Sequence, residues 1–157
     1  MSETVIQVTS LGKRIKGKTI LEDISFEINK GDCVALIGPN GAGKTVLMSC
    51  ILGDKKPSSG QVLIDGKAGK AKNKIAVLLQ ENTIPNSLKV EELIAFFQSI
   101  SDNPLTNQEV QELLQFKEDQ YQQFADKLSG GQRRLLAFVL CLIDKPKILF
   151  LDEPTAG

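Results

Sequence analysis

The chain has 157 residues, the length of a single domain, and its 41% hydrophobic content is that of an ordinary soluble globule. Its 19 basic and 19 acidic side chains cancel to a net charge of zero, which provides no basic field for binding nucleic acid. The longest apolar run, residues 135–143, is far shorter than the roughly 20 residues of a membrane span, and residues 1–5 lack the pattern of a signal peptide. We therefore expect a globular chain that crosses no membrane.

The first predicted elements are two strands with a basic connection between them. Residues 4–9 read as the first strand, and Ile24, Phe26 and Ile28 alternate with polar residues in the second. The connection 12–19, GKRIKGKT, has the spacing of a phosphate-binding loop. A strand follows it, however, where such a loop needs the N-terminus of a helix. We interpret 12–19 as a link between strands.

The stretch 38–45, GPNGAGKT, has the same spacing in the right context. It follows the apolar run 33–37, predicted to be a buried strand, and it precedes a predicted helix 44–52 that ends at Gly53. This is the Walker A pattern, in which glycines let backbone N–H groups approach phosphate oxygens at the positive end of a helix. A tight turn without a ligand is the alternative. The residues predicted to bind phosphate are Gly38, Pro39, Asn40, Gly41, Ala42, Gly43, Lys44 and Thr45.

Two side chains of this loop add chemistry that its backbone lacks. Lys44 supplies a full positive charge for the β- and γ-phosphates of a nucleoside triphosphate, and Thr45 supplies a hydroxyl that is a ligand for Mg²⁺. The loop therefore predicts a bound nucleoside triphosphate with Mg²⁺.

The next residues predict two more strands. Residues 60–64 form a short strand that is closed by the turn pair 65–66. The Lys-, Gly- and Ala-rich stretch 66–74 reads as a solvated loop, with phosphate binding as the less favoured alternative because no helix start follows it. Residues 75–79 form a second buried strand, which ends at Gln80.

Helix signals replace strand signals over residues 81–127. Apolar residues recur with helical spacing over 89–100. Thr106 and Glu109 form a capping box that opens a second helix. The glutamine-rich piece 118–123 reads as a polar connection rather than an interaction motif. A small helical insert is thus predicted within a strand-rich fold.

The segment 128–132, LSGGQ, opens a further helix with Ser129 as its N-cap. Its glycines expose backbone N–H groups at a helix N-terminus, which predicts a second phosphate-binding surface. A helix start that is merely capped would read the same way. The residues predicted for the buried side of this helix are Leu135, Leu136, Val139, Leu140 and Ile143.

The last predicted element is the apolar strand 148–151, which is followed by Asp152 and Glu153. Open α/β sheets bind ligands at the carboxyl ends of buried parallel strands. Asp152 is then placed to hold Mg²⁺, and Glu153 to orient and deprotonate a water that attacks the γ-phosphate. The alternative is a buried strand followed by two solvated acids.

One nucleotide does not need two phosphate-binding surfaces on distant parts of a chain. The economical arrangement is two copies facing head to tail, each completing the site of the other. In this order, GPNGAGKT, LSGGQ and ILFLDEP resemble the motifs of the ATP-binding subunits of ABC (ATP-binding cassette) transporters, and the resemblance covers nearly the whole chain.

The resemblance implies a role for each matching residue. Lys44 and Thr45 match the phosphate lysine and the magnesium hydroxyl, and Gln80 matches a glutamine that senses the γ-phosphate and Mg²⁺. Asp152 and Glu153 match the magnesium aspartate and the catalytic carboxylate. The residues that match the signature closing over the partner's ATP are Ser129, Gly130, Gly131 and Gln132.

The resemblance also implies the architecture and the partners. The fold is an α/β P-loop NTPase fold with a mixed central sheet, an N-terminal antiparallel part and a small helical insert. Residues 1–157 are one nucleotide-binding domain without its C-terminal part, built from a core (1–80), the insert (81–127) and the signature helix with the last strand (128–157). The implied partners are a transmembrane permease, which docks on the insert and the Gln80 loop, and a second nucleotide-binding subunit, identical or related. No nucleic-acid partner is expected.

The sequence departs from the family pattern at two places. Ile15, flanked by Arg14 and Lys16, stands where the family stacks an aromatic ring on adenine. The chain also stops at Gly157, before the family's γ-phosphate histidine, and it contains no histidine. The 157 residues by themselves are therefore expected to be poorly active.

Three functions follow, in order of preference. The first is an ATPase on the cytoplasmic face of a membrane that powers a transporter, with an exporter of drugs, peptides or antibiotics suggested by weak analogy. The second is a soluble ABC-type ATPase acting on ribosomes or DNA, which the absence of long heptads and of basic linkers disfavours. The third is a nucleotide-binding regulator without turnover.

The three cysteines are predicted to be buried thiols in a reducing compartment. Cys33 lies in the predicted strand 33–37, and Cys50 and Cys141 lie in predicted helices, all with apolar neighbours and without metal-ligand spacing.

Overall fold

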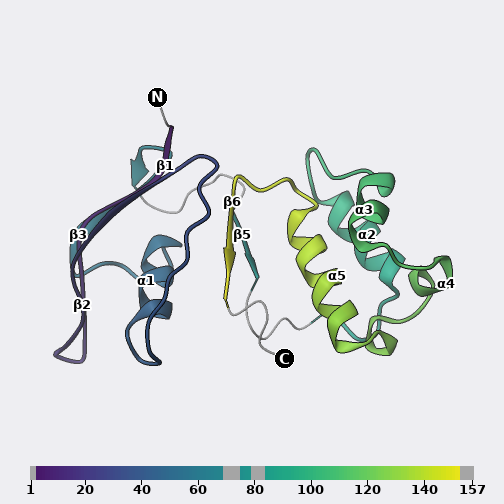
Figure 1. Ribbon diagram of the computed structural model, residues 1–157, viewed down its shortest axis with the longest axis horizontal. Helices are drawn as coiled ribbons and strands as arrows, with labels where there is room; N and C mark the ends of the chain where they lie inside the picture. Colours follow the sequence, from purple (N-terminus) through teal and green to yellow (C-terminus); the bar gives the residue numbers. More distant parts are fainter. Residues whose placement is uncertain (1–2, 69–74, 79–83, 153–157) are drawn as a thin grey trace. The chain divides into compact units, whose positions relative to one another are not determined.

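The computed structural model describes residues 3–68, 75–78 and 84–152 and divides the chain into two compact units. The N-terminal unit comprises residues 1–72 and the C-terminal unit residues 73–157. Figure 1 shows strands β1 to β4 and helix α1 in the first unit, and β5, β6 and helices α2 to α5 in the second. The first unit carries the Walker A loop, and the second carries the LSGGQ segment and the strand that precedes Asp152.

The N-terminal unit is built on an antiparallel sheet in the order β2-β1-β3-β4. The strands are β1 (Thr4–Ile15), β2 (Lys18–Asn29), β3 (Ser59–Ile64) and β4 (Lys67–Ala68). Lys16 and Gly17 join β1 to β2 with φ values of 48° and 79°, the left-handed pair of a tight hairpin. The predicted link between two strands is confirmed, but it is shorter than the stretch 12–19, because β1 runs to Ile15 and β2 begins at Lys18.

Helix α1 (Lys44–Ile51) contacts β2 and buries Leu47, Cys50 and Ile51. It ends as predicted. Leu52 is the C-cap, and Gly53, with φ of 78°, takes the left-handed conformation that terminates helices. The Asp65–Gly66 turn is also confirmed, because both residues have positive φ between β3 and β4.

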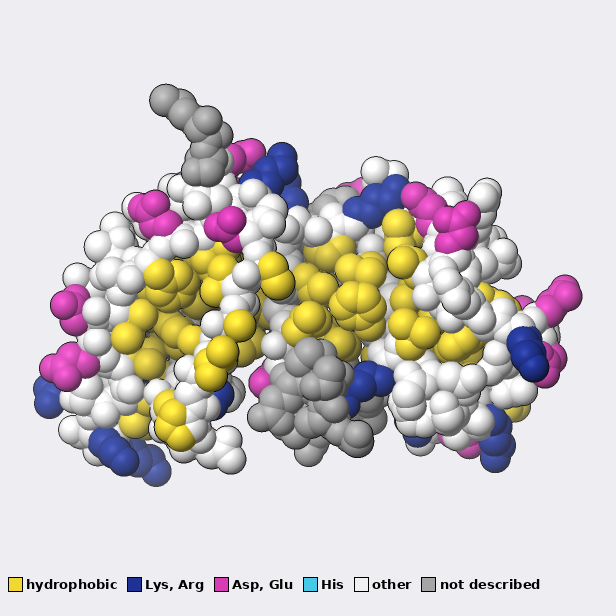
Figure 2. Space-filling model, viewed as in Figure 1, with side chains coloured by type: hydrophobic (Ala, Val, Ile, Leu, Met, Phe, Trp, Pro, Cys, Tyr) yellow, Lys and Arg dark blue, Asp and Glu magenta, His cyan; other side chains and the backbone are white. Residues whose placement is uncertain are grey.

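The prediction of a buried strand over 33–37 is wrong for the described structure. The segment has no strand assignment, and the side chains of Val34, Leu36 and Ile37 are exposed, that of Ile37 by 91%. The four strands of its unit pair with one another and leave the segment out. Hydrophobic side chains are open to the surface in the part of this unit seen in Figure 2. Apolar composition favours burial, but a strand also needs a neighbouring strand to pair with.

The C-terminal unit combines a parallel strand pair with helices. Strands β5 (Ile75–Leu78) and β6 (Ile148–Leu151) pair in register, with Ile75 opposite Ile148 and Leu78 opposite Leu151. The helices are α2 (Val90–Ser99), α3 (Asn107–Leu114), α4 (Glu118–Tyr121), a 3₁₀ turn (Ala125–Lys127) and α5 (Gly130–Leu142). Helix α5 contacts β5, α2 and α3 (Figure 1). The fully buried side chains of the core include Leu93, Val90, Val110, Leu136, Val139 and Ile143.

The predicted helix starts in this unit are confirmed. Thr106 caps α3, since its hydroxyl accepts from the Glu109 N–H at 3.2 Å and the Glu109 carboxylate accepts from the Thr106 N–H at 2.7 Å. These hydrogen bonds lower the pKa of Glu109. The 118–123 connection contains α4, which the polar composition did not indicate. Of the predicted buried side of α5, only Leu135 is exposed.

Two of the three cysteines are buried or half-buried, as expected, and the third is not. Burial raises the pKa of the Cys50 and Cys141 thiols, which favours the unreactive protonated form. Cys33 is exposed, because it begins the unpaired segment 33–37. Among the described residues, no helix has both the length and the apolar content that crossing a bilayer requires.

Candidate functional site

The Walker A loop leads into α1 through two glycines with left-handed backbone. Gly41 has φ of 81° and Gly43, the N-cap of α1, has φ of 93°. A Cβ atom at Gly43 would lie 3.0 Å from the Leu21 Cδ2 and 3.3 Å from the Ile20 carbonyl oxygen. Glycine is therefore required at position 43 both for conformation and for space. The loop passes close to β2 because nothing projects from this residue.

The polar groups of the loop are arranged as donors. The Lys44 ammonium donates to the carbonyl oxygens of Gly38 and Pro39, the latter at 2.9 Å, which holds it over the loop. Helix α1 has no side-chain cap and no acidic residue in its first turn. Its first N–H groups have no partner within the helix. Thr45, in that first turn, is exposed. This set of N–H groups, ammonium and hydroxyl fits a phosphate group with a hard cation beside it.

The carboxyl end of the parallel strand pair carries Asp152. The Asp152 N–H donates to the Leu78 carbonyl oxygen at 2.9 Å, which continues the ladder beyond β6, and the side chain is half-buried. Gln80 follows β5 by two residues, and Glu153 follows Asp152; both lie outside the described residues. Because β5 and β6 are parallel and in register, the chain leaves both strands at the same edge of the sheet.

The LSGGQ segment forms a closed capping box. The Ser129 hydroxyl accepts from the Gln132 N–H at 3.2 Å, and the Gln132 side-chain oxygen accepts from the Ser129 N–H at 3.0 Å. Gly130 and Gly131 are exposed, and a Cβ on either would meet no atom within 4 Å. The capped helix start is confirmed, and its open glycine face is available to a partner. Nucleotide binding there stays a prediction.

The predicted site residues are divided between the two units. The LSGGQ segment and Asp152 belong to the C-terminal unit, and the Walker A loop belongs to the N-terminal unit. Ile15 is half-buried at the end of β1 and pairs with Lys18. The individual roles assigned to these residues stay predictions.

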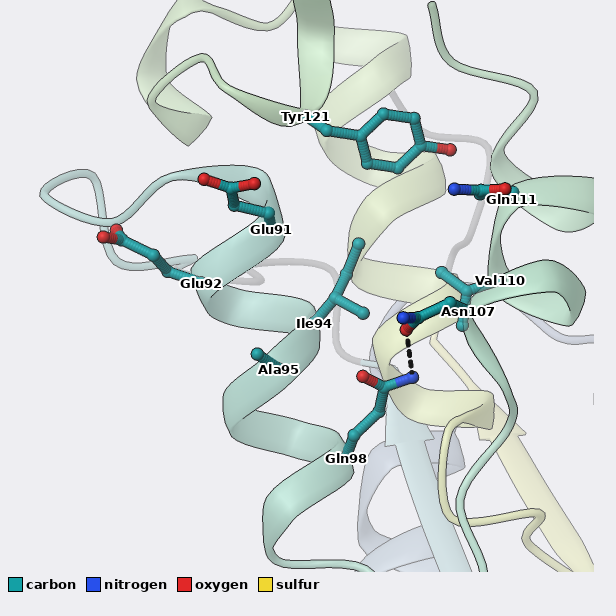
Figure 3. Close-up of a pocket in the computed structure, with 9 residues that line it drawn as sticks. All are labelled: Glu91, Glu92, Ile94, Ala95, Gln98, Asn107, Val110, Gln111 and Tyr121. Carbon is teal, nitrogen blue, oxygen red and sulfur yellow. Dashed lines mark hydrogen bonds between the residues drawn. The ribbon is translucent and has the colours of Figure 1, made fainter. Parts of the chain in front are cut away.

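A pocket of about 450 Å³ lies between α2, α3 and α4. Figure 3 shows its walls. The Gln98 Nε2 donates to the Asn107 Oδ1 at 2.9 Å on one side, and Tyr121 closes another. Ile94 and Val110 form an apolar floor. None of the predicted nucleotide-binding residues is among the residues that line this pocket.

One contact near the LSGGQ segment escaped the sequence analysis. The Arg133 guanidinium on α5 donates to the Asn86 side-chain oxygen at 3.0 Å, across 47 residues of sequence. Neither residue belongs to a recognisable pattern. The only sequence signal is that Arg133 directly follows the LSGGQ segment.

Comparisons with known proteins place the chain in a family. A family model described as ABC transporter matches residues 21–156. The chain is 36% identical over 156 residues to the spermidine/putrescine import ATP-binding protein PotA of Protochlamydia amoebophila, covering 94% of this chain and 42% of that protein. It is 35% identical over 147 residues to the high-affinity branched-chain amino acid transport ATP-binding protein BraG of Pseudomonas aeruginosa, covering 87% and 63%. The chain is thus much shorter than the curated relatives it matches.

Solved structures agree with the fold. The chain superposes on CbiO1 of Clostridium perfringens, part of the ABC transporter complex CbiONQ, with a TM-score of 0.83 and 27% identity over 99% of this chain and 67% of that chain. An ATP-binding cassette of an ABC transporter in its ADP conformation matches with a TM-score of 0.80 and 26% identity over 98% and 70%. The predicted P-loop NTPase fold is confirmed. With the family model matched over residues 21–156, this chain belongs to the ABC transporter family, as a nucleotide-binding domain.

Proposed function

We propose that this chain is the ATP-binding and hydrolysing subunit that powers an ABC membrane transporter. The observation that carries the proposal is the geometry of the Walker A loop. Its two left-handed glycines, the Lys44 ammonium over the loop and the uncapped start of α1 form a complete anion-binding set. Residues 1–157 act in this proposal as one nucleotide-binding domain with 81–127 as its insert.

Each residue has a stated task in this proposal. Lys44 neutralises charge on the β- and γ-phosphates, and Glu153 orients and deprotonates the attacking water. Gln80 senses the γ-phosphate. Thr45, Gln80 and Asp152 would hold Mg²⁺, which neutralises phosphate charge when it is bound.

The second phosphate-binding surface implies a second subunit. The open glycine face of the signature, Gly130 and Gly131, would cover the nucleotide held by the Walker A loop of the mate, and Ser129 and Gln132 would flank it. ATP binding would close the pair and hydrolysis would open it. The mate is either an identical chain or a related one.

The relatives favour import over export. PotA is named an import protein, and so is the methionine import ATP-binding protein MetN of Legionella pneumophila, which is 36% identical over 166 residues. We therefore propose an importer, and the exporter suggested by sequence analogy receives no support from these relatives. These relatives are named as transport proteins, which also disfavours the alternative of an ATPase acting on ribosomes or DNA.

The permease is proposed to dock on the helical insert. Phe96 on α2 and Ile100, the C-cap of that helix, lie four residues apart and so share one face, and they are 55% and 64% exposed. Large exposed apolar side chains on a helix favour a protein partner. Through that partner the subunit would sit on the cytoplasmic face of the membrane.

The test is Glu153→Gln in the assembled transporter. Loss of the base with retention of binding should trap an ATP-bound closed pair and stop uptake, measured by analytical ultracentrifugation and by substrate uptake into vesicles. Normal turnover by this variant would remove Glu153 as the base. Single particles at saturating ATP would contradict the head-to-tail pair.

A further inference from the structure

The described residues that lead into α2, 84–90, are attached to the segment that leads into the signature. Val90 donates its N–H to the Gln123 carbonyl oxygen at 3.0 Å, and the Leu88 carbonyl oxygen accepts from the Ala125 N–H at 3.0 Å. Lys89 and Phe124 form an antiparallel bridge between these bonds. The result is a short antiparallel clasp between residues 88–90 and 123–125.

The clasp is anchored in the core on both sides. Val90 and Ala125 are fully buried, and Ile84, at the start of the same segment, belongs to the same apolar cluster. Paired backbone groups between buried anchors leave little freedom for one strand to slide along the other. The two segments therefore move together.

The path from the clasp to the signature is short and stiff. Ala125 begins the 3₁₀ turn Ala125–Lys127, the buried Leu128 follows, and Ser129 caps α5. The Lys127 N–H donates to the Phe124 carbonyl oxygen at 3.0 Å. A displacement of the clasp is thus transmitted to the N-cap of α5 within four residues.

A side-chain hydrogen bond also attaches the start of α5 to the residues that precede α2. The Arg133 N–H donates to the Ser129 carbonyl oxygen at 2.8 Å, in the first helical turn of α5, and its guanidinium donates to the Asn86 side-chain oxygen at 3.0 Å. The start of the signature helix is therefore held to the post-Gln80 segment through a backbone route and through a side-chain route.

We infer that Arg133, through Asn86, is a positioning residue that couples the segment following Gln80 to the signature. The inference rests on the proposed function, in which Gln80 and Ser129 act on nucleotides at two ends of this connection. A shift of residues 84–90 would then reorient the glycine face of the signature, and a shift of the signature would in turn move residues 84–90. Arg133 contacts no nucleotide in this role.

The test begins with hydrogen–deuterium exchange on the chain itself. Asn86 is exposed, so Asn86→Ala should leave the fold intact. It should raise exchange both in residues 84–90 and in 129–133, by roughly two- to fivefold, as expected for one lost hydrogen bond. Asn86→Asp, which keeps an acceptor for the guanidinium, should restore protection, and Asn103→Ala, an exposed asparagine elsewhere in the same unit, should change neither segment.

The second measurement is steady-state ATPase activity in the assembled transporter. Asn86→Ala should lower kcat while KM for ATP changes by less than about twofold, because the Walker A loop is untouched. Exchange that rises only in 84–90, with 129–133 unchanged, would overturn the inference. ATP binding by the unsubstituted chain, measured in parallel, reports on the proposed function separately, since the exchange result requires no nucleotide.

Discussion

Two helices of this molecule begin at glycine-rich turns, and they begin differently. Helix α1 has a glycine N-cap in left-handed conformation with no side-chain cap, whereas α5 has the Ser129–Gln132 capping box. The N-terminus of α1 carries Lys44, whose ammonium is held over the loop, and the N-terminus of α5 carries two exposed glycines with open space around them.

The difference distinguishes a helix start that leaves its N–H groups free for a ligand from one whose own side chains cap it. At α1 the N–H groups of the first turn are left for a ligand, and the charge that balances phosphate lies beside them. At α5 the capping box already satisfies part of the helix end, and the one basic side chain of the first turn, Arg133, donates to Asn86. We expect α1 to bind nucleotide alone and α5 to act only on a nucleotide that a mate presents.

The largest effect is expected from Lys44→Ala. Removing the ammonium should weaken ATP binding by roughly 100-fold or more, because charge-assisted hydrogen bonds to phosphate are lost. Isothermal titration calorimetry with ATP checks this. The matched control is Lys18→Ala, which removes the corresponding lysine of the hairpin 12–19 and should leave the affinity unchanged. Micromolar affinity retained by Lys44→Ala would place nucleotide binding elsewhere.

The next largest effect concerns the backbone at the N-terminus of α1. Gly43→Ala should lower the free energy of unfolding by about 1–3 kcal/mol, because the residue has positive φ and its Cβ would crowd Leu21 and Ile20. Urea denaturation measures it. Gly41→Ala, with positive φ but no atom within 4 Å of the added Cβ, should cost only about 1 kcal/mol. Equal costs for the two variants would show that crowding at position 43 is unimportant.

At the other helix start, Ser129→Ala should cost about 1 kcal/mol of stability, the usual value for a lost N-cap. Urea denaturation again measures the loss, and affinity of the single chain for ATP should not change. A drop in that affinity would show that the signature contacts nucleotide within one chain, which would remove the contrast between the two starts.

The smallest effect on stability is expected from Gly131→Ala. The added methyl group meets open space, and alanine is the better helix former, so stability should stay the same or rise by up to about 1 kcal/mol. The same methyl group would stand between the signature and the mate's nucleotide. ATP-driven pairing, measured by ultracentrifugation, should therefore weaken while the fold does not. Undiminished pairing would contradict the assignment of this face to the mate.

Sequence alone was sufficient for features that depend on residues close together in the chain. The strand connection within 12–19, the glycine loop at 38–45, the capping box at Thr106 and the N-cap at Ser129 depend on conformational preferences and on hydrogen bonds that span a few residues, so spacing predicts them. The residues of the candidate site were predicted from the same local patterns. The resemblance of the chain to its family was predicted from the order of the three motifs along the sequence.

Tertiary structure decided what depends on partners far along the chain. The apolar run 33–37 reads as a buried strand, yet it is exposed and has no strand assignment, because a strand needs a neighbour to pair with and the four strands of its unit pair with one another. Leu135 and Cys33 are also exposed, although both are apolar residues with apolar neighbours in the sequence. The Asn86–Arg133 bond spans 47 residues and leaves no periodic signal, since a long-range polar contact is set by how helices and loops pack and not by local preference.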